Sequence, residues 1–448
     1  MSVLDFIAFI IYVFIFNFIF SFRRKQYADA RLRKYHKIGF WIKVFSCLAY
    51  TMFVLYISPG DTTALYFPEG YNIYKLILKD SNYLNLLYVP ASGFDQALLA
   101  DIYNLGYFNE ESNYTVTKIT AFFCFFTFGK FMAINLIFSM ISFTGVWRLY
   151  RFFYEQYPAL HKQFAIAILF LPTFVFWSSG ILKDPLCTGA LGWLTYSLYS
   201  VFYSKKNFLK YAIIAGLSAY VLVILKVYII VSYVPFFALF LILQNVNLIK
   251  NKLIKILLVT GFFTASIFSF IRITNTMQKA LGSFASQGLS QSVKNYQVNY
   301  EAQAFTAQSN FSLGVEFDGS VNSLAKLAPA AIIATLFRPF LWESKKLSTL
   351  LSSFESLAFM LLTIFVFIKV GIKNVVKTII SKPIVMYSLF FSLIFSLFVG
   401  ATTLNFGTLV RYKIPAVPFY LISMFLILYF NNKLKVKPGL SQAVTVLE

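Results

Sequence analysis

Residues 3–37 read VLDFIAFIIYVFIFNFIFSFRRKQYADARLRKYHK, in which a long apolar run leads directly into a basic cluster. The apolar run is about as long as the ~20 residues that an α-helix needs to cross the hydrocarbon core of a bilayer. A helix is the natural form for such a run, because it satisfies its own backbone hydrogen-bonding groups in lipid. Segments rich in Lys and Arg typically flank membrane spans on the cytoplasmic side. The same alternation continues along the chain, so this stretch predicts the fold class of the whole.

The composition excludes an ordinary soluble protein. Of the 448 residues, 59% are hydrophobic and only 12% are charged, whereas about a quarter of the residues in a typical soluble domain are charged. The net charge of +22 would favour a nucleic-acid partner in a soluble chain. Here the basic residues stand in short clusters between apolar runs, which is the pattern of the positive-inside rule. We therefore expect membrane lipids, and no nucleic acid, as partners.

We predict an all-α, polytopic integral membrane protein with about eleven transmembrane helices in a single domain over residues 1–448. The expected spans are 3–22, 40–58, 119–147, 162–179, 186–203, 209–225, 228–247, 254–272, 350–369, 383–402 and 413–431. The basic links between them are then cytoplasmic, which puts the N-terminus outside and the tail, residues 432–448, inside. Two long loops lie outside, over residues 59–118 and 273–349, and long loops in compact proteins are often functional.

Cysteine and histidine chemistry is not expected. Cys47, Cys124 and Cys187 lie within or at the edge of apolar runs without a CxxC pair, which argues against a disulfide framework and a cysteine zinc site. His36 and His161 are far apart in the sequence and are flanked by basic residues. Charged residues near the predicted outer face are therefore the candidates for a functional site.

The first candidates lie in FWSSGILKDPL, residues 176–186, between two apolar runs. Pro185 suits the first position of a helix, which predicts that Asp184 is the N-cap of the span that follows. Lys183 precedes this helix start, where backbone N–H groups and the helix dipole attract anions. The simpler interpretation is a polar turn in which the two charges pair. The functional interpretation is a phosphate contact at Lys183.

Asp61 follows the second expected span directly, in SPGDTT (58–63), where Pro59 and Gly60 end the helix. An aspartate at such a turn often only accepts hydrogen bonds from nearby backbone N–H groups. At the membrane surface, however, the Asp61 carboxylate also suits general base catalysis or the binding of a divalent metal ion such as Mg²⁺ or Mn²⁺.

Four more charges stand at predicted outer ends of spans. Lys226, in VILKVYII (223–230), either snorkels to the interface or serves a function near membrane depth. Arg338 and Glu343 stand among the aromatic residues of FRPFLWE, which fit an interfacial anchor, and Arg338 binds either a lipid headgroup or a substrate phosphate. Arg411 is either an ordinary charge flanking a span or a residue whose guanidinium group binds phosphate through two hydrogen bonds.

All of these residues fall on the predicted outer face, where the positive-inside rule disfavours cations. Cations there would hold a lipid-linked phosphate or diphosphate and stabilise it as a leaving group, while a carboxylate would activate an attacking hydroxyl. The candidates for catalysis are Asp61, Asp184 and Glu343, and those for phosphate binding are Lys183, Lys226, Arg338 and Arg411.

The layout resembles the GT-C superfamily of integral-membrane glycosyltransferases, through short motifs spread over most of the chain. Asp61 in PGDTTALYF (59–67) matches the placement of the catalytic acidic residue in that superfamily's first long outer loop. VRYKIPAVP (410–418) is similar to an Arg-Tyr with spaced prolines near its last spans. FWSSGILKD and FRPFLWE are similar to stretches of bacterial membrane proteins from surface-polysaccharide gene clusters. The resemblance implies sugar transfer from a polyprenyl-phosphate donor at the outer face of the bacterial inner membrane.

Two features depart from the family pattern: an extra span precedes the first outer loop, and Gly60 stands where a second acidic residue would form a paired motif. One alternative is an O-antigen-type polymerase acting on polyprenyl-diphosphate-linked repeat units, in which Arg338 and Arg411 outrank Asp61. Another is a transporter of polysaccharide precursors. A transporter predicts charges inside the helix bundle and repeat symmetry, and the sequence shows little of either.

Overall fold

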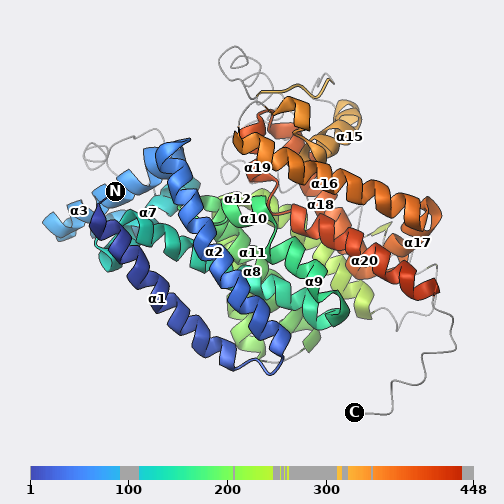
Figure 1. Ribbon diagram of the computed structural model, residues 1–448, viewed down its shortest axis with the longest axis horizontal. Coiled ribbons are helices and arrows are strands. Elements are labelled where there is room, and N and C mark those ends of the chain that lie inside the picture. Colours follow the sequence, from blue (N-terminus) through green and yellow to red (C-terminus); the bar gives the residue numbers. More distant parts are fainter. Residues whose placement is uncertain are drawn as a thin grey trace. The chain divides into compact units, whose positions relative to one another are not determined.

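The computed structural model describes residues 2–90, 110–204, 207–245, 310–314, 321–344 and 347–435, together with residues 253, 257, 260 and 261. All regular secondary structure in these residues is helical (Figure 1), which confirms the predicted all-α class. Six described helices are long and apolar enough to cross a bilayer, and a pair bent by 63° makes a seventh if it counts as one span. The protein is therefore a helical membrane protein.

The six spanning helices agree with the predicted spans in place but not in number. They are Val3–Lys25, Ala30–Tyr56, Phe131–Gln156, Phe208–Gln244, Thr349–Val370 and Pro383–Thr402, and the bent pair is Phe406–Tyr412 with Val417–Asn432. The larger number of spans and their sidedness stay predictions. The expected span 254–272 and the tail 432–448 lie almost wholly outside the described residues.

The described residues divide into two compact units, of which unit 1 ends at Val231 and unit 2 begins at Ser232. The single domain expected over residues 1–448 stays a prediction. The described elements of unit 1 are α1 (Val3–Lys25), α2 (Ala30–Tyr56), η1 (Thr62–Tyr66), α3 (Phe67–Lys79), η2 (Ser81–Leu84), α4 (Asn85–Tyr88), α7 (Glu111–Thr127), α8 (Phe131–Gln156), η4 (Pro158–Leu160), α9 (His161–Phe164), η5 (Ala165–Leu169), α10 (Pro172–Trp177), α11 (Lys183–Tyr199), η6 (Ser200–Ser204) and the first part of α12 (Phe208–Asn245). Those of unit 2 are the rest of α12, α15 (Val321–Phe337), η9 (Leu341–Glu343), α16 (Leu347–Val370), α17 (Ile372–Ser381), α18 (Pro383–Thr402), α19 (Phe406–Tyr412) and α20 (Val417–Lys435).

Helices α1, α2 and α8 share an apolar core. The ring of Phe20 in α1 meets Phe40 of α2 and Phe143 of α8 edge-on, with centroids 5.7 and 5.5 Å apart. Other positions of α1 remain exposed and apolar, among them Phe14 and Phe18, which are 68% and 77% exposed. An apolar surface of this kind on a spanning helix is suited to contact with lipid chains.

Helices α8 and α11 approach so closely that glycine is required where they touch. A Cβ atom at Gly145 would lie 1.8 Å from the carbonyl oxygen of Gly189, and one at Gly192 would lie 2.0 Å from that of Gly145. Membrane helices associate through close van der Waals packing, and small residues permit it. This contact fixes α11, and with it the segment that carries Lys183 and Asp184, against the core of unit 1.

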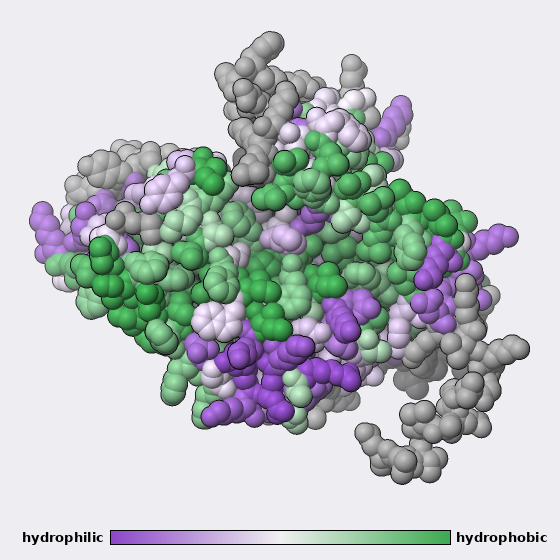
Figure 2. All heavy atoms as spheres, viewed as in Figure 1, coloured by the Kyte–Doolittle hydropathy of each residue, from purple (hydrophilic) through white to green (hydrophobic). Residues whose placement is uncertain are grey.

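The basic links of unit 1 gather at one end. Trp147 Nε1 donates a hydrogen bond to Tyr27 OH over 2.8 Å, and Tyr35 OH lies 2.8 Å from His161 Nδ1. These bonds join the region between α1 and α2 to the last turns of α8 and the start of α9. Figure 2 shows hydrophilic side chains gathered over the end where α1 passes into α2. Segments predicted for the cytoplasmic side thus share one end of unit 1.

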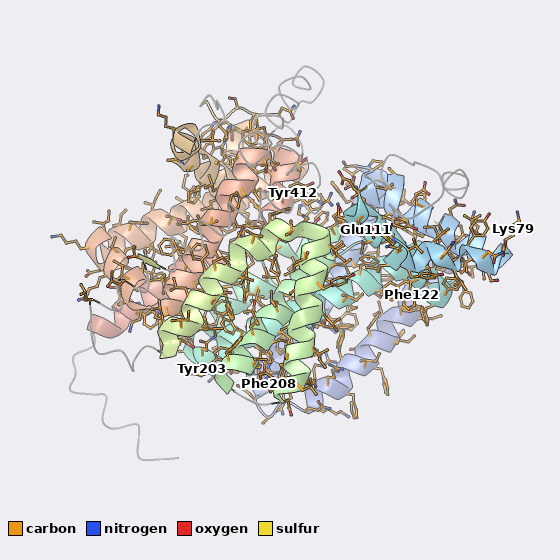
Figure 3. The ribbon with its side chains drawn as sticks, turned by 180° about the vertical axis from the view of Figure 1, so that it is seen from behind. Lys79, Glu111, Phe122, Tyr203, Phe208 and Tyr412 are labelled. Carbon is orange, nitrogen blue, oxygen red and sulfur yellow. The ribbon has the colours of Figure 1, made fainter. Side chains whose placement is uncertain are left out.

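The described part of the predicted outer loop 59–118 is largely helical and packs against α7. Tyr66 OH donates to Asn113 Oδ1 over 2.9 Å, which joins the end of η1 to the first turns of α7. Figure 3 shows Glu111, at the start of α7, toward the end of unit 1 opposite to Tyr203 and Phe208. The segments predicted for the outer face therefore share the end opposite to the basic links.

Two expected spans are interrupted. Within 119–147, α7 ends at Thr127 and α8 begins at Phe131, because Phe128 and Gly129 adopt left-handed backbone angles with φ of +52° and +67°. The expected span 162–179 consists of α9, η5 and α10. Its helix stops before Pro172, which has no N–H to continue a helical ladder and instead starts α10. Hydropathy does not register such breaks.

Unit 2 has its own close helix contact and its own bent span. A Cβ atom at Gly400 of α18 would lie 2.1 Å from the carbonyl oxygen of Ala331 in α15. The expected span 413–431 begins at Val417 instead, and the short helix α19 precedes it at an angle of 63°. In the predicted outer loop 273–349, α15 forms a helix and residues 273–309 lie outside the described part.

Candidate functional site

Residues 178–182 form a buried turn between α10 and α11 in unit 1, and we call this segment the turn. All five of its residues are buried, so FWSSGILKDPL is not an exposed polar link. The turn packs so tightly that a Cβ atom at Gly180 would lie 1.9 Å from the ring of Tyr50. Backbone groups buried in this way must find partners inside the protein.

Lys43, in the middle of α2, is the hydrogen-bond donor to the oxygens of Ser178 and Ser179. Its side chain is buried, with 3% of the residue exposed. Its Nζ donates to Ser178 Oγ over 2.7 Å and to Ser179 Oγ over 3.1 Å, and it also contacts the carbonyl oxygen of Ser178. The ammonium group therefore holds the first half of the turn.

Both backbone groups of Ile181 are hydrogen-bonded to side chains of other elements. Its N–H donates to Asn135 Oδ1 over 2.9 Å, and its carbonyl oxygen accepts from Thr62 Oγ1 over 2.8 Å. Since the Thr62 hydrogen is used in this way, the hydroxyl of Tyr50, 2.6 Å away, donates to Thr62. The bond from Thr62 ties the start of η1, and its neighbour Asp61, to the turn. Asp61 is half-buried.

Lys183 stands within the start of α11, and not before it as the sequence had indicated. It is the first residue of the helix, and its Nζ donates to Ser112 Oγ in the first turn of α7 over 2.8 Å. The side chain is half-buried. An ammonium group beside a helix N-terminus forms, with the backbone N–H groups there, a favourable environment for an anion.

The predicted N-cap role of Asp184 is wrong. Leu182 precedes the helix and Asp184 lies within its first turn. The carboxylate instead accepts a hydrogen bond from Lys226 Nζ over 2.5 Å, in an ion pair whose two side chains are 0% and 6% exposed. The local pattern around Pro185 favoured a cap, but a buried carboxylate gains more from a cation that neutralises it.

Lys226 does not snorkel to an interface. It lies inside α12, where two helical segments merge across a kink, and its own backbone is non-helical with φ −152° and ψ 74°. The expected spans 209–225 and 228–247 therefore meet at this residue without a separate loop. The kink directs the Lys226 side chain into the protein, onto Asp184.

Glu69 is a site residue that the sequence interpretation missed. It lies in α3, only 2% exposed, and its Oε2 has no hydrogen-bond partner among the described residues. Burial raises the pKa of this carboxyl to about 7, because the charged form loses hydration. Tyr66, one helical turn earlier, bonds to Asn113, the neighbour of Ser112. Glu69 therefore belongs to the same end of unit 1 as Lys183.

The structure brings four of the seven predicted residues together and keeps the other three in unit 2. Lys183 and Asp184 follow the turn in the chain, Lys226 pairs with Asp184, and Asp61 precedes Thr62, which bonds to the turn. We call these four residues, with Lys43, Thr62 and Asn135, the turn cluster. The signal for Lys43 was present in the sequence, as a single cation inside an apolar span. Glu69 gave no signal beyond its place among other acidic residues of the loop.

In unit 2, Arg338 and Glu343 bind each other. Arg338 Nε lies 3.0 Å from Glu343 Oε1, and Nη1 donates to the carbonyl oxygen of Ser312 over 3.1 Å. The guanidinium also covers the stacked rings of Phe311 and Phe406, 4.4 and 5.2 Å from their centroids. Most of the N–H donors of the Arg338 guanidinium thus already have acceptors, which weakens the interpretation of this residue as a phosphate contact.

Two further cations of unit 2 belong to the bent pair of helices. Lys413 is buried and donates to Ser356 Oγ over 3.0 Å and to the carbonyl oxygen of Arg338 over 3.2 Å. Arg411 is half-buried and lies over the ring of Tyr412 at 5.8 Å. Lys413 thus braces the Arg338 segment against α16, whereas Arg411 keeps its predicted place beside the last helix.

No family model, curated protein or solved structure matches the chain. The resemblance to the GT-C superfamily therefore stays a prediction. Among the described residues, no group of three or more His, Cys, Asp or Glu side chains is placed to hold a metal ion. The metal-binding role of Asp61 also stays a prediction.

The chemistry available in the turn cluster follows from its charges. Lys183 at the start of α11 can hold an anionic group, and Asp61 is a half-exposed carboxylate near it in the chain of bonds through Thr62 and Ile181. Asp184 and Lys226 neutralise each other inside the protein. Asp184 and Lys226 form a buried ion pair that supports the helix start, whereas Asp61 and Lys183 are only half-buried and are the charges of the turn cluster that a substrate could reach.

Proposed function

We propose that the protein is a multi-pass glycosyltransferase of the bacterial inner membrane that transfers a sugar from a polyprenyl-linked donor in cell-surface polysaccharide synthesis. The observation that carries the proposal is the tie between Thr62 and Ile181. It brings the neighbourhood of a carboxylate, Asp61, to the helix start that carries Lys183. A carboxylate and a cation at one membrane-facing site are the two groups that transfer from a phosphate-linked donor requires.

In the proposed reaction, Asp61 accepts the proton of an acceptor hydroxyl, whose oxygen forms a bond to the anomeric carbon of the donor. The bond between that carbon and the phosphate oxygen breaks, and polyprenyl phosphate leaves with the electron pair. Lys183 and the backbone N–H groups at the start of α11 stabilise the charge that develops on the phosphate. Asp184 and Lys226 hold this helix start in place through their buried ion pair.

The proposed topology has about eleven spans, with the turn cluster at the outer face. The basic links gather at one end of unit 1, and the segments that carry Asp61 and Lys183 lie toward the other, which supports this sidedness. Exposed basic residues at the first of these ends, such as Arg31, Arg33 and Lys37, are the expected cytoplasmic anchors.

The test is turnover by the purified protein in liposomes that contain polyprenyl-phosphate hexoses, with release of polyprenyl phosphate as the readout. Asp61→Asn and Lys183→Met are expected to lower the rate about 10²-fold or more. Asp80→Asn and Lys210→Met are matched controls at exposed positions. Asn can keep the cap that Asp80 makes to Asn82. Equal losses in the controls, or full activity of Asp61→Asn, would reject the assignment.

A polymerase would give a different result in the same liposomes. With polyprenyl-diphosphate-linked oligosaccharides it would lengthen the lipid-linked chain, and Arg411→Ala would stop the lengthening while Asp61→Asn would not. The involvement of Arg338 with Glu343 and Ser312 makes this the less favoured alternative.

Transport is a second candidate, because one specific observation favours it. A transporter predicts charges inside the helix bundle, and Lys43, Asp184 and Lys226 are buried charges on or between apolar helices. Broken helices beside such charges are also a feature of transporters, and α10 and α11 flank a break. A transporter would move the intact sugar lipid across the liposome membrane, without release of polyprenyl phosphate.

A further inference from the structure

The ammonium group of Lys43 has an unusual environment for a buried charge. The three oxygens around it belong to Ser178 and Ser179 and carry no formal charge. Within the described part of the chain, the ion pairs are formed by other residues and none involves Lys43. Buried ammonium groups are ordinarily compensated by a carboxylate. Among the residues that the structure describes, it is these neutral oxygens that replace its hydration.

The orientation of the two serines fits a cation rather than a chance contact. Ser178 Oγ donates its hydrogen to the carbonyl oxygen of Phe174 over 2.5 Å, and Ser179 Oγ donates to that of Val175 over 2.6 Å. With their hydrogens directed away, both hydroxyl oxygens present lone pairs to Lys43 Nζ. Together with the carbonyl oxygen of Ser178 they form a cradle at the C-terminal end of α10.

Such a cradle has the ligands of a small monovalent cation site. Unwound backbone carbonyls and the C-terminal ends of interrupted helices coordinate Na⁺ in membrane proteins, and hydroxyl and carbonyl oxygens are the donors that hard cations prefer. Here α10 ends at Trp177, and the unwound residues that follow provide the oxygens. The lysine reaches the same place from α2.

We infer that the turn is a monovalent-cation site whose cation is the chain's own Lys43 ammonium group. The native protein is then independent of Na⁺ at this position, because the site is permanently filled. Shortening Lys43 empties the cradle and converts it into a site for Na⁺. This property of the turn is independent of whether the protein is a sugar transferase, a polymerase or a transporter.

The test compares Lys43→Ser with Lys43→Met in detergent, by thermal unfolding in NaCl and in choline chloride of equal concentration. Serine opens the cradle and adds a fourth oxygen, so Na⁺ is expected to raise the melting temperature of Lys43→Ser by about 2–4 °C. Methionine is about as long as lysine and fills the space without charge, so Lys43→Met is expected to show no difference between the salts. The native protein is also expected to show none.

Two results would overturn the inference: a folded Lys43→Ser whose melting temperature is the same in both salts, or an equal Na⁺ response in Lys43→Met. If Lys43→Ser does not fold in either salt, Ser178→Ala with Ser179→Ala tests the same cradle from the other side. Removing both hydroxyls leaves the ammonium short of ligands. Adding Lys43→Met to that pair is then expected to raise the melting temperature, and a fall or no change would reject the cation site.

Discussion

Asp184 and Lys226 illustrate how desolvation limits the contribution of a buried ion pair to the free energy of unfolding. Both side chains have left water almost completely, at 0% and 6% exposed, and meet at 2.5 Å. The attraction between them largely offsets the cost of burying two charges, so the pair adds little net stability. Losing one partner is different, because the remaining charge stays buried and loses the opposite charge that neutralised it.

Asp184→Asn is therefore expected to destabilise the protein by about 2–4 kcal/mol. Lys226→Met added to Asp184→Asn should recover at least half of that loss, since both charges of the pair are then removed together. The measurement is chemical unfolding of each variant in the same detergent. Glu111→Gln is the control, because its pair with Lys118 is partly exposed and is expected to be worth less than about 1 kcal/mol. An equal cost for the single and the double variant would contradict the buried-pair account.

Glu69 illustrates the same effect for a carboxyl that pairs with no cation among the described residues. Its folded-state pKa of about 7 lies above the ordinary value of 4.5, because burial disfavours the charged form. Between these two values the folded protein holds a proton that the unfolded chain releases. Stability from this group is therefore complete below pH 4.5 and is lost as the pH rises through about 7.

Glu69→Gln should remove this part of the pH dependence. We expect the stability difference between native protein and variant to shift in favour of the variant from pH 4.5 to 7 and to stay level above about pH 8. Melting temperatures of both proteins across that range, in one detergent and at one ionic strength, give the measurement. A difference that does not change with pH would mean that Glu69 is charged throughout.

At the scale of elements, the contact between α8 and α11 positions the turn cluster. Gly145→Ala would bring a methyl group against the backbone of α11, 1.8 Å from the Gly189 oxygen. We expect a loss of about 1–3 kcal/mol from this overpacking, together with lower activity, because α11 carries Lys183. Gly216→Ala in α12 is the matched control. A Cβ atom there meets nothing within 4 Å, so alanine should be neutral or stabilising by up to about 1 kcal/mol. Equal behaviour of the two variants would contradict the close contact.

The sequence predicts the helices better than the contacts between them. Apolar runs and basic links are local signals, and they indicated the helical membrane class and most of the spanning helices. The partner of Asp184 lies 42 residues away, so the local cap at Pro185 looked equally good. The interruptions at Phe128 and before Pro172 leave the apolar character of the runs unchanged. Lys43 is visible as a single cation in an apolar span, but its partner Ser178 lies 135 residues away and gives no local signal.

For the whole molecule, the testable property is the side of the membrane on which each end of unit 1 lies. The basic links occupy one end of unit 1, and the segments that carry Asp61 and Lys183 lie toward the opposite end (Figures 2 and 3). The positive-inside rule puts the basic end in the cytoplasm. The same rule predicts a cytoplasmic link between α16 and α18, which includes the exposed Lys373.

Labelling of single cysteines in intact cells measures this sidedness. Cys47, Cys124 and Cys187 are buried and are first replaced by alanine. A membrane-impermeant reagent is then expected to modify cysteine at positions 80 and 110, and to modify positions 210 and 373 only after the cells are opened. All four positions are exposed, so a difference in labelling reports the side of the membrane and not burial within the protein. Labelling of 80 and 210 from the same side would overturn the proposed topology.

The central claim is that Lys183, at the start of α11, recognises a lipid-linked phosphate. Equilibrium binding of a short isoprenyl phosphate, compared with the corresponding isoprenyl alcohol, tests it most directly. We expect the native protein to bind the phosphate about tenfold more tightly than the alcohol, the value of one charge-assisted hydrogen bond. Lys183→Met should lose this preference, while Lys210→Met should keep it. Equal affinity for phosphate and alcohol in the native protein, or a preference that survives Lys183→Met, would contradict the account.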